Sequence, residues 1–240
     1  MHTLTSSERL IDWQVAVLRE LGRELPPGAT YLDFGCGAGK DVDAARTAGF
    51  DAFGCDIVLD LETERLRRIE APYRIPFSTA TFDFVGSNTV FEHVQNPAEA
   101  FGEIHRVLKP GGTSVHMFPS RWSLREPHTY VPLASVIQSW PWLKMWAMLG
   151  VRNEFQSGMS SPEVAGLNHA YLRDHTRYLT RRQIRSEAQS AFARVVFAEG
   201  AAITTSRGRL GLLAPVVRRA PLVARAYSGL RARVVFLENA

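Results

Sequence analysis

The sequence predicts an α/β fold in which a mostly parallel sheet is covered by helices on both faces. Two observations indicate this fold. Between residues 30 and 119, short apolar segments typical of buried strands alternate with segments of helical period. The first predicted strand also runs directly into three glycines at alternate positions. Alternation of this kind makes successive strands parallel, and such sheets bind ligands at the carboxyl ends of their strands.

The first predicted element is a helix over residues 5–24, whose apolar positions share one face and pack on the sheet. It ends at the turn Pro26-Pro27-Gly28. The elements that follow are predicted as strand 30–35, helix 40–49, strand 51–56, helix 60–69, strand 82–87, helix 97–108 and strand 113–119.

Residues 120–177 break the alternation and show few clean periods. A long insertion after a strand end is often a lid over an active edge, so this segment is predicted to be a lid or acceptor insertion within a single domain, 1–240. Its tryptophan-rich run, 139–148, is either the core of the insertion or an apolar wall for an acceptor.

Alternation resumes with helix 180–192 and strand 193–198, and a near-copy of that strand at 232–238 ends the sequence. We expect these two strands to pair as an antiparallel hairpin at the sheet edge. The segment between them, 205–231, is predicted to be a helical insertion that prolines interrupt.

Positive charge is concentrated near the end of the sequence, where residues 205–240 hold seven arginines and a single acid, Glu238. Because the excess is confined to this segment, no nucleic-acid partner is expected. The basic and apolar stretch 209–230 has a second interpretation, peripheral contact with an anionic membrane surface.

The composition is that of an ordinary soluble globular protein, with 240 residues, 45% of them hydrophobic and 22% charged. No signal peptide and no apolar run of about 18 residues is visible, so a cytoplasmic protein is expected. Cys36 and Cys55 are expected to be a reduced pair rather than a disulfide.

The stretch 31–39, Tyr-Leu-Asp-Phe-Gly-Cys-Gly-Ala-Gly, organises the predicted sheet. Its glycines permit positive φ and let a ligand approach the bare backbone. Asp56 follows Gly39 by 17 residues, the spacing at which a βαβ unit places a carboxylate on a ribose. The spacing G-x-G-x-G disfavours a nicotinamide dinucleotide, and the absence of G-x-x-x-x-G-K-[ST] disfavours a nucleoside triphosphate.

Five motifs occur in order along the sequence. They are Asp33-Phe-Gly-Cys-Gly-Ala-Gly39, Gly54-Cys-Asp56-Ile, Ile75-Pro-Phe77 with Phe82-Asp83-Phe-Val85, Phe91-Glu-His-Val94, and Arg106-Val-Leu-Lys-Pro-Gly-Gly112. Together they resemble the signature of class I S-adenosylmethionine-dependent methyltransferases over residues 25–120, with a weaker match over 178–200. The resemblance implies a Rossmann-like, doubly wound sheet of seven strands, one of them reversed, and the cofactor S-adenosyl-L-methionine.

The resemblance also implies roles for individual residues at the carboxyl edge of the sheet. The methionine end of the cofactor would meet Asp33 and the glycine backbone, and Asp56 would bind the ribose. Either Glu70 or the backbone of Ala71 would bind the adenine amino group. The full predicted cofactor set is Asp33, Gly35, Cys36, Gly37, Gly39, Asp56, Ile57, Glu70, Ala71 and Asn88.

Two histidines are candidates for a general base, the role that histidine commonly takes near neutral pH. His93 follows the third core strand, and His128 follows a proline in the insertion. The alternatives are structural: His93 packs under the cofactor, or His128 bonds only to backbone. Some family members with the pair Glu92-His93 hold Mg²⁺ with a further acid at the position of Thr89, so no metal ion is predicted here.

The predicted function is methyl transfer to a small-molecule acceptor, with a hydroxyl of a sugar, glycolipid or natural product favoured. The asparagine-proline-proline-aromatic signature of adenine and amide methylation is absent, since Ser87-Asn88-Thr89-Val90 stands in its place. Two alternatives stay open, a relative that binds the cofactor or a partner without catalysis and a nicotinamide oxidoreductase. Oligomeric state is not predicted.

Overall fold

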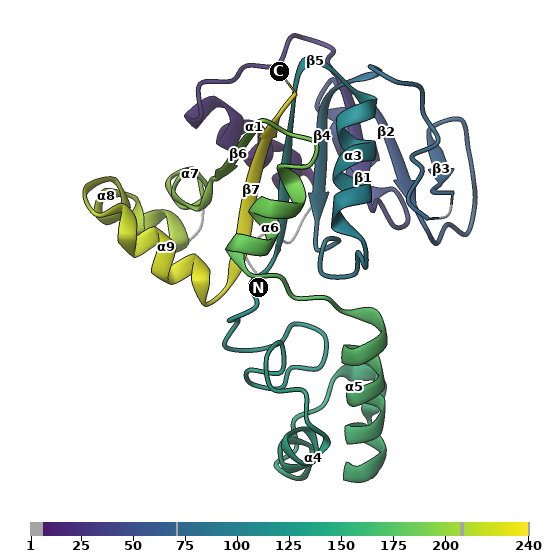
Figure 1. The fold of residues 1–240 in the computed structure, drawn as a ribbon, viewed down its shortest axis with the longest axis vertical. Coiled ribbons are helices and arrows are strands. Elements are labelled where there is room, and N and C mark those ends of the chain that lie inside the picture. Colours follow the sequence, from purple (N-terminus) through teal and green to yellow (C-terminus); the bar gives the residue numbers. More distant parts are fainter. Residues whose placement is uncertain (1–6, 71, 207–208, 240) are drawn as a thin grey trace.

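The computed structural model describes residues 7–70, 72–206 and 209–239, and its centre is a seven-stranded sheet (Figure 1). The strands lie in the order β3-β2-β1-β4-β5-β7-β6. Their bounds are β1 Thr30–Phe34, β2 Asp51–Asp56, β3 Leu66–Arg68, β4 Phe82–Asn88, β5 Leu108–Pro119, β6 Arg194–Phe197 and β7 Ala232–Glu238. Among the strands of the described residues, β7 alone runs antiparallel to its neighbours, so the predicted sheet with one reversed strand is confirmed.

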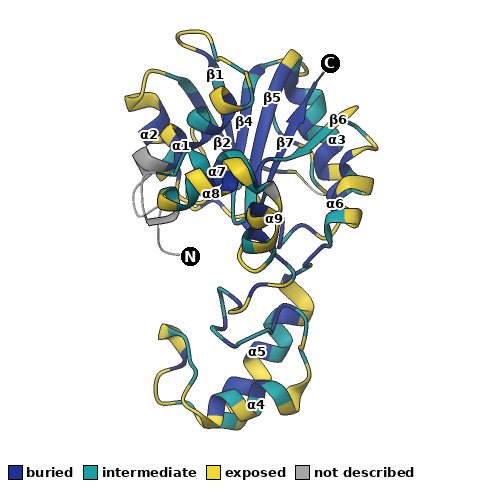
Figure 2. Cartoon of the chain, turned by 90° about the vertical axis from the view of Figure 1, so that its left-hand side faces the viewer, coloured by how far each residue is buried: buried dark blue, intermediate teal, exposed yellow. Residues whose placement is uncertain are grey.

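Helices cover both faces of the sheet, and side chains of each strand alternate between them. Leu32 and Phe34 face the cluster that includes α3 (Pro97–Val107) and α6 (Arg181–Ala188). Tyr31 faces the cluster that includes the helices α1 (Ser7–Glu20), α2 (Lys40–Thr47) and α7 (Glu199–Thr204). The central strands are buried on both faces (Figure 2), as expected for a parallel sheet between two helical layers.

One predicted element is wrong. Residues 60–69 do not form a helix; they form a loop and the short strand β3. The segment is rich in Glu and Arg, which favour helices, but the free edge of β2 offers backbone partners that outweigh this preference. Gly54 donates its N–H to the carbonyl of Arg65, and Leu66 packs where a Cβ of Gly39 would lie.

Most other boundaries lie within a few residues of the prediction, with one larger shift. Residues 109–112, which lie between the predicted helix 97–108 and strand 113–119, belong to β5, and this strand begins at Leu108 and pairs there with Phe82. The strand is irregular at this point, because its register with β4 shifts between Phe82 and Phe84 and Gly111 has a φ of 77°.

The insertion 120–177 projects from the end of the sheet where β5 ends (Figures 1 and 2). It contains α4 (Trp140–Met148), a 3₁₀ turn η1 (Glu154–Gln156) and α5 (Ser161–His175). Its buried side chains form a small core of their own: Val131, Ala134, Leu143, Ala165, Leu172 and Tyr178. Trp142 and Trp146 pack against this core, which agrees with the interpretation of the tryptophan run as core of the insertion.

The predicted hairpin is confirmed, since β6 pairs antiparallel with β7 at the sheet edge. Between these strands lie α7, a 3₁₀ turn η2 (Arg209–Leu213), α8 (Ala214–Arg219) and α9 (Pro221–Gly229). A proline lies in the first turn of both α8 and α9, as predicted for an interrupted helix. Within the described ranges, no helix has the length and apolar character needed to cross a membrane.

Candidate active site

The glycine bend and Asp56 lie together, as their spacing predicts. After β1 the chain turns through Gly35, Gly37 and Gly39, with φ of 81°, 50° and 81°, and α2 begins at Lys40. The N–H of Gly37 donates to Oδ2 of Asp56 at 2.8 Å. The carboxylate therefore lies directly against the bend at the end of β2.

Asp33 and Cys36 lie deeper than their neighbours in the predicted cofactor set. The Asp33 side chain is buried, and burial together with the nearby charges of Asp41 and Asp56 raises the pKa of its carboxyl group. Cys36 packs on Gly54, where an added Cβ would lie 2.7 Å from the sulfur, and burial raises the pKa of its thiol to about 12. Both cysteines are free. The Cys36 side chain thus serves packing, and only its backbone remains for a ligand.

Other predicted cofactor residues differ in their surroundings. Ile57 is 59% exposed beside Asp56. Glu70 is exposed, lies 3.9 Å from Arg74 as an ion pair, and lines an open hollow at the β3 edge together with Phe77. Ala71 lies outside the described residues. Within the described chain, no contact joins Glu70 to the glycine bend, and its role in adenine binding stays a prediction.

The turn after β4 packs on the glycine bend. Thr89 has a φ of 56°, an uncommon backbone conformation for a β-branched residue, and Val90 lies over Gly35. A Cβ built on Gly35 would lie 2.3 Å from Cγ2 of Val90, so only glycine fits there. The side-chain oxygen of Asn88 is buried without a hydrogen-bond partner. A buried, unpartnered oxygen next to the bend can accept a hydrogen bond from a donor group of a ligand.

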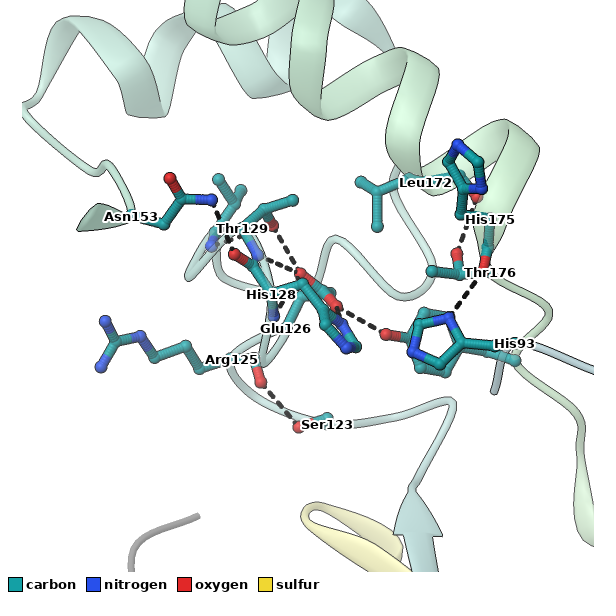
Figure 3. A network of polar contacts seen from close by, with 12 residues as sticks. His93, Ser123, Arg125, Glu126, His128, Thr129, Asn153, Leu172, His175 and Thr176 are labelled. Carbon is teal, nitrogen blue, oxygen red and sulfur yellow. Dashed lines mark hydrogen bonds and ion pairs between the residues drawn. The ribbon is translucent and has the colours of Figure 1, made fainter. Parts of the chain in front are cut away.

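His93 follows in the same turn and is fixed by two hydrogen bonds. Its backbone N–H donates to the carbonyl of Val90, and its Nδ1 lies 2.8 Å from the carbonyl oxygen of His175 (Figure 3). A carbonyl only accepts, so Nδ1 carries the proton and Nε2 is the unprotonated nitrogen of the neutral ring. Burial lowers the pKa of His93 and outweighs the bond to His175.

His128 is held by a residue that the sequence analysis did not assign, Glu126. Nδ1 of His128 lies 2.7 Å from Oε1 of Glu126, which is fully buried. Glu126 also accepts from the Tyr178 hydroxyl at 2.6 Å and from the hydroxyl and N–H of Thr129. The motif Arg125-Glu126-Pro127-His128 places an acid two residues before the histidine, which could have indicated this pair. In a loop, however, sequence spacing does not tell whether two side chains point toward each other.

Glu126 and His128 each shift the pKa of the other. Burial raises the pKa of Glu126, but its hydrogen bonds, first those from His128 and Tyr178, outweigh burial and lower the pKa to about 2. Burial lowers the pKa of His128, yet the bond to Glu126 outweighs it and raises the pKa. A buried carboxylate bonded to Nδ1 thus orients the imidazole and stabilises its protonated form.

Glu92 completes a cluster with the two histidines. Its side chain is buried, neither carboxylate oxygen has a hydrogen-bond partner, and burial raises its pKa to about 7. One ligand atom from each of Glu92, His93 and His128 lies within 4.8 Å of the others. The rings of His93 and His128 meet edge to face with centroids 4.9 Å apart. Two histidines that are 35 positions apart in the sequence therefore share one site.

A cavity of about 410 Å³ lies in the insertion and reaches this site. His128 lines it, together with Leu167 and Tyr171 from α5 and Phe155 from η1. The volume lies within the range of small-molecule sites in proteins. His169 does not line the cavity, and His175 contributes its carbonyl oxygen to His93.

A family model described as a methyltransferase domain matches residues 8–191, which include the glycine bend, the β4 turn and the whole insertion. The chain belongs to the methyltransferase-domain family. The expectation drawn from the five motifs is confirmed.

Several curated relatives of this methyltransferase carry names that include O-methyl transfer. A ubiquinone biosynthesis O-methyltransferase of Methylococcus capsulatus is 34% identical, covering 36% of this chain and 41% of that protein. A malonyl-[acyl-carrier protein] O-methyltransferase of Pseudescherichia vulneris is 25% identical, covering 70% of this chain and 76% of that protein. A 37.1 kDa transposon protein of Streptomyces fradiae is 32% identical, and the match spans 30% of its length. The chain thus spans less than half the length of two of these relatives.

Solved structures share the fold of this methyltransferase. An S-adenosylmethionine-dependent methyltransferase of Mesorhizobium loti gives a TM-score of 0.53 at 17% identity, covering 98% of both chains. Phosphoethanolamine N-methyltransferase 2 of Haemonchus contortus, solved with S-adenosylhomocysteine, gives 0.50 at 15% identity, covering 93% of this chain and 51% of that one. At these identities the likeness shows a shared fold, and it agrees with S-adenosyl-L-methionine as the predicted cofactor.

The residues at the bend fit this cofactor. Asp56 presents two carboxylate oxygens for a pair of ribose hydroxyls, and Ile57 offers an exposed apolar surface beside it. The unpartnered oxygen of Asn88 lies at the end of the adjacent strand β4. The edge of the sheet therefore offers hydrogen-bond acceptors and an apolar surface of the kind that an adenosyl group needs, and the individual roles stay predictions.

Proposed function

We propose that this methyltransferase transfers a methyl group to the hydroxyl of a small-molecule acceptor, held at the cavity beside His128. The observation that carries the proposal is the Glu126–His128 pair, in contact with His93 and open to that cavity. The bound cofactor supplies an electrophilic methyl group. A hydroxyl is a weak nucleophile until its proton is removed, and a positioned base speeds such a reaction.

His128 is the proposed base. Its Nδ1 is bonded to Glu126, so Nε2 is the nitrogen that takes the acceptor's proton, and Glu126 stabilises the imidazolium that forms. His93 lies beside it with Nδ1 fixed by His175, and we assign it to orienting the acceptor.

The donor and acceptor sites are linked through the turn after β4. Val90 packs on Gly35 of the bend, and its carbonyl accepts the N–H of His93. The reacting groups would thus be brought together by two adjacent segments of the same sheet edge, and such positioning supplies much of the rate. We assign to the insertion 120–177 the role of acceptor site and lid.

The acceptor class rests on the cavity and on the names of relatives. The O-methyltransferases among them act, by name, in ubiquinone biosynthesis and on malonyl-[acyl-carrier protein]. The cavity wall in this chain mixes aromatic, apolar and amide groups, which suits an amphiphilic acceptor such as a glycolipid or natural product.

Peripheral membrane contact through residues 209–230 is part of the proposal. Exposed apolar side chains gather on this segment and beside it: Leu212, Val216, Leu222, Leu230 and Trp122. Arginines stand among them: Arg218, Arg219, Arg225 and Arg231. A segment that exposes both apolar side chains and arginines favours contact with an anionic lipid surface. Flotation with anionic and with neutral vesicles tests this contact, and equal recovery of the protein from both would contradict it.

Transfer of a labelled methyl group to a cell extract tests the proposed reaction, and mass analysis of the product identifies the acceptor. His128→Gln should then lower kcat about 10²- to 10⁴-fold, the usual worth of a general base, while affinity for S-adenosylhomocysteine stays within twofold. His169→Gln in the same insertion is the matched control and should leave kcat unchanged. Wild-type turnover in both His93→Gln and His128→Gln would refute base catalysis, and no labelled product at all would indicate a binding protein.

A further inference from the structure

We infer that Glu92, His93 and His128 bind one divalent transition-metal ion, with its open coordination positions directed to the acceptor cavity. The binding of the ion stands on the geometry of the cluster alone. Only the role given to the ion, holding the acceptor hydroxyl, rests on the proposed function. With the ion bound, Nε2 of His128 is a ligand, and the ion activates the hydroxyl in place of His128 as base.

The three side chains are close enough to share an ion. One ligand atom from each lies within 4.8 Å of the other two. Ligands at about 2.1 Å from a metal in tetrahedral geometry lie roughly 3.4 Å from one another. Closing the cluster onto an ion therefore requires side-chain movements of about 1 Å, and no rearrangement of the backbone.

Both histidines already have the outer partners that metal-bound histidines have in proteins. Nδ1 of His93 is bonded to the carbonyl of His175, and Nδ1 of His128 is bonded to the buried carboxylate of Glu126 (Figure 3). Such partners fix the tautomer, aim Nε2 at the metal and increase its basicity. Figure 3 shows the two rings near one another, with Glu126 next to the His128 ring and His175 bonded to the His93 ring.

Glu92 supplies the independent observation that points to a cation. Its side chain is 1% exposed, and both carboxylate oxygens lack a hydrogen-bond partner. An unpaired carboxylate is unfavourable in a protein interior, and metal coordination is one of the few ways to stabilise it there. The two imidazoles beside it are the nearest suitable co-ligands.

The ligand set selects the kind of ion. Two imidazole nitrogens with one carboxylate suit Zn²⁺, Fe²⁺, Co²⁺ or Ni²⁺, whereas Mg²⁺ and Ca²⁺ prefer oxygen ligands. Thr89 offers no carboxylate that could make the set richer in oxygen. Three protein ligands leave at least one position open, as in catalytic rather than structural sites. A hydroxyl bound there would lose its proton to solvent more readily, and its oxygen would remain bound to the ion.

Cobalt binding by the full-length protein, freed of any affinity tag and stripped with a chelator, tests the inference. We expect one equivalent of Co²⁺ to bind with a saturable ligand-field absorption in the visible range. Zn²⁺ should abolish this absorption, and Mg²⁺ at the same concentration should not. Absence of a saturable signal from the wild-type protein would overturn the inference without recourse to any variant.

Variants assign the ligands. Glu92→Gln and His128→Gln should each weaken Co²⁺ binding more than 100-fold, and Glu126→Gln, which alters only an outer partner, about 10- to 100-fold. His169→Gln, at a half-buried histidine outside the cluster, is the control and should bind as the wild type does. Should Glu92→Gln fail to fold, judged by its thermal melt and its affinity for S-adenosylhomocysteine, His93→Gln replaces it. Wild-type affinity in a folded ligand variant would overturn the assignment.

The two proposals fail in different ways. If the stripped protein binds no Co²⁺ and still methylates its acceptor, the metal site is refuted and His128 acts as the base. If Co²⁺ binds in the ligand-dependent manner described but no hydroxyl is methylated, the metal site stands and the proposed function fails.

Discussion

Replacement of Asp56 by alanine tests the assignment of the cofactor's ribose. In the structure, the Asp56 carboxylate accepts from the N–H of Gly37 at 2.8 Å and from the N–H of Val58 at 3.0 Å. Both oxygens therefore already lie in a position to accept hydrogen bonds at the bend. A bound ribose diol would take up the free acceptor capacity of the same two oxygens.

The expected effect follows from the two bonds that alanine cannot make. A hydrogen bond to a charged group contributes about 1.5–3 kcal/mol, and part of this is recovered when water solvates the freed hydroxyls. A net loss of about 2–4 kcal/mol corresponds to an affinity about 30- to 1000-fold weaker. Asp56→Asn keeps one acceptor and should lose about tenfold. Folding should change little, because Gly37 and Val58 are exposed and water replaces their lost acceptor.

Calorimetric titration with S-adenosylhomocysteine measures the loss. Asp60→Ala is the matched control, since Asp60 is an exposed acid on the same loop and the variant has the same net charge. It should bind within twofold of the wild type. If Asp56→Ala also binds within twofold while melting normally, the ribose is held elsewhere and the argument from spacing is wrong.

Three further predictions concern the fold around the site. Gly35→Ala should lose about 2–5 kcal/mol of unfolding free energy in urea, because alanine disfavours the positive φ and its Cβ would overlap Val90. Gly37→Ala should lose only about 1–2 kcal/mol, because no atom lies within 4 Å of its added Cβ. Equal losses in the two variants would refute the packing argument. Burial lowers the pKa of His116 from 6.5 to about 3, so below pH 6.5 the unfolded chain binds a proton that the folded chain does not. Urea titrations should show stability falling by about 1.4 kcal/mol per pH unit below 6.5, and His116→Gln should lack this component. Tyr178→Phe should cost about 1.5–3 kcal/mol in the same assay, because its hydroxyl donates to a buried carboxylate, and an unchanged unfolding midpoint would contradict this.

The sequence predicted the sheet well because its strands are buried on both faces. Continuous apolar segments and the glycine bend after Phe34 are local signals, and they located β1, β2 and β4 within a residue or two. The strand β3 has no such signal. It exists because β2 offers an open edge, and that information lies in the assembled sheet rather than in residues 60–69.

The site was predicted in part for the same reason. Asp56 and the bend belong to one βαβ unit, so spacing alone brings them together. His93 and His128 were identified singly as candidates, but their contact depends on how a long insertion folds back. Glu126 was not assigned because a loop has no period that tells which side chains converge. Glu92 was identified only as part of a motif, and its lack of a partner is visible only in three dimensions.

The assembled site draws on two parts of the chain that are joined by specific hydrogen bonds. Glu92 and His93 belong to the sheet edge, whereas Glu126 and His128 belong to the insertion. The carbonyl of Glu92 accepts the N–H of Arg177, where the insertion returns to the core.

At the other end of the insertion, Ser120 donates its hydroxyl to the carbonyl of Gly229 at 2.6 Å, and Trp122 shares a surface hollow with Leu222 and Leu230. The stem of the insertion is therefore bonded to the last turn of α9, within the same apolar and basic segment proposed to meet a membrane. Because the Ser120–Gly229 bond joins this stem to α9, the loop that carries His128 and the segment 209–230 are held to each other by direct contacts.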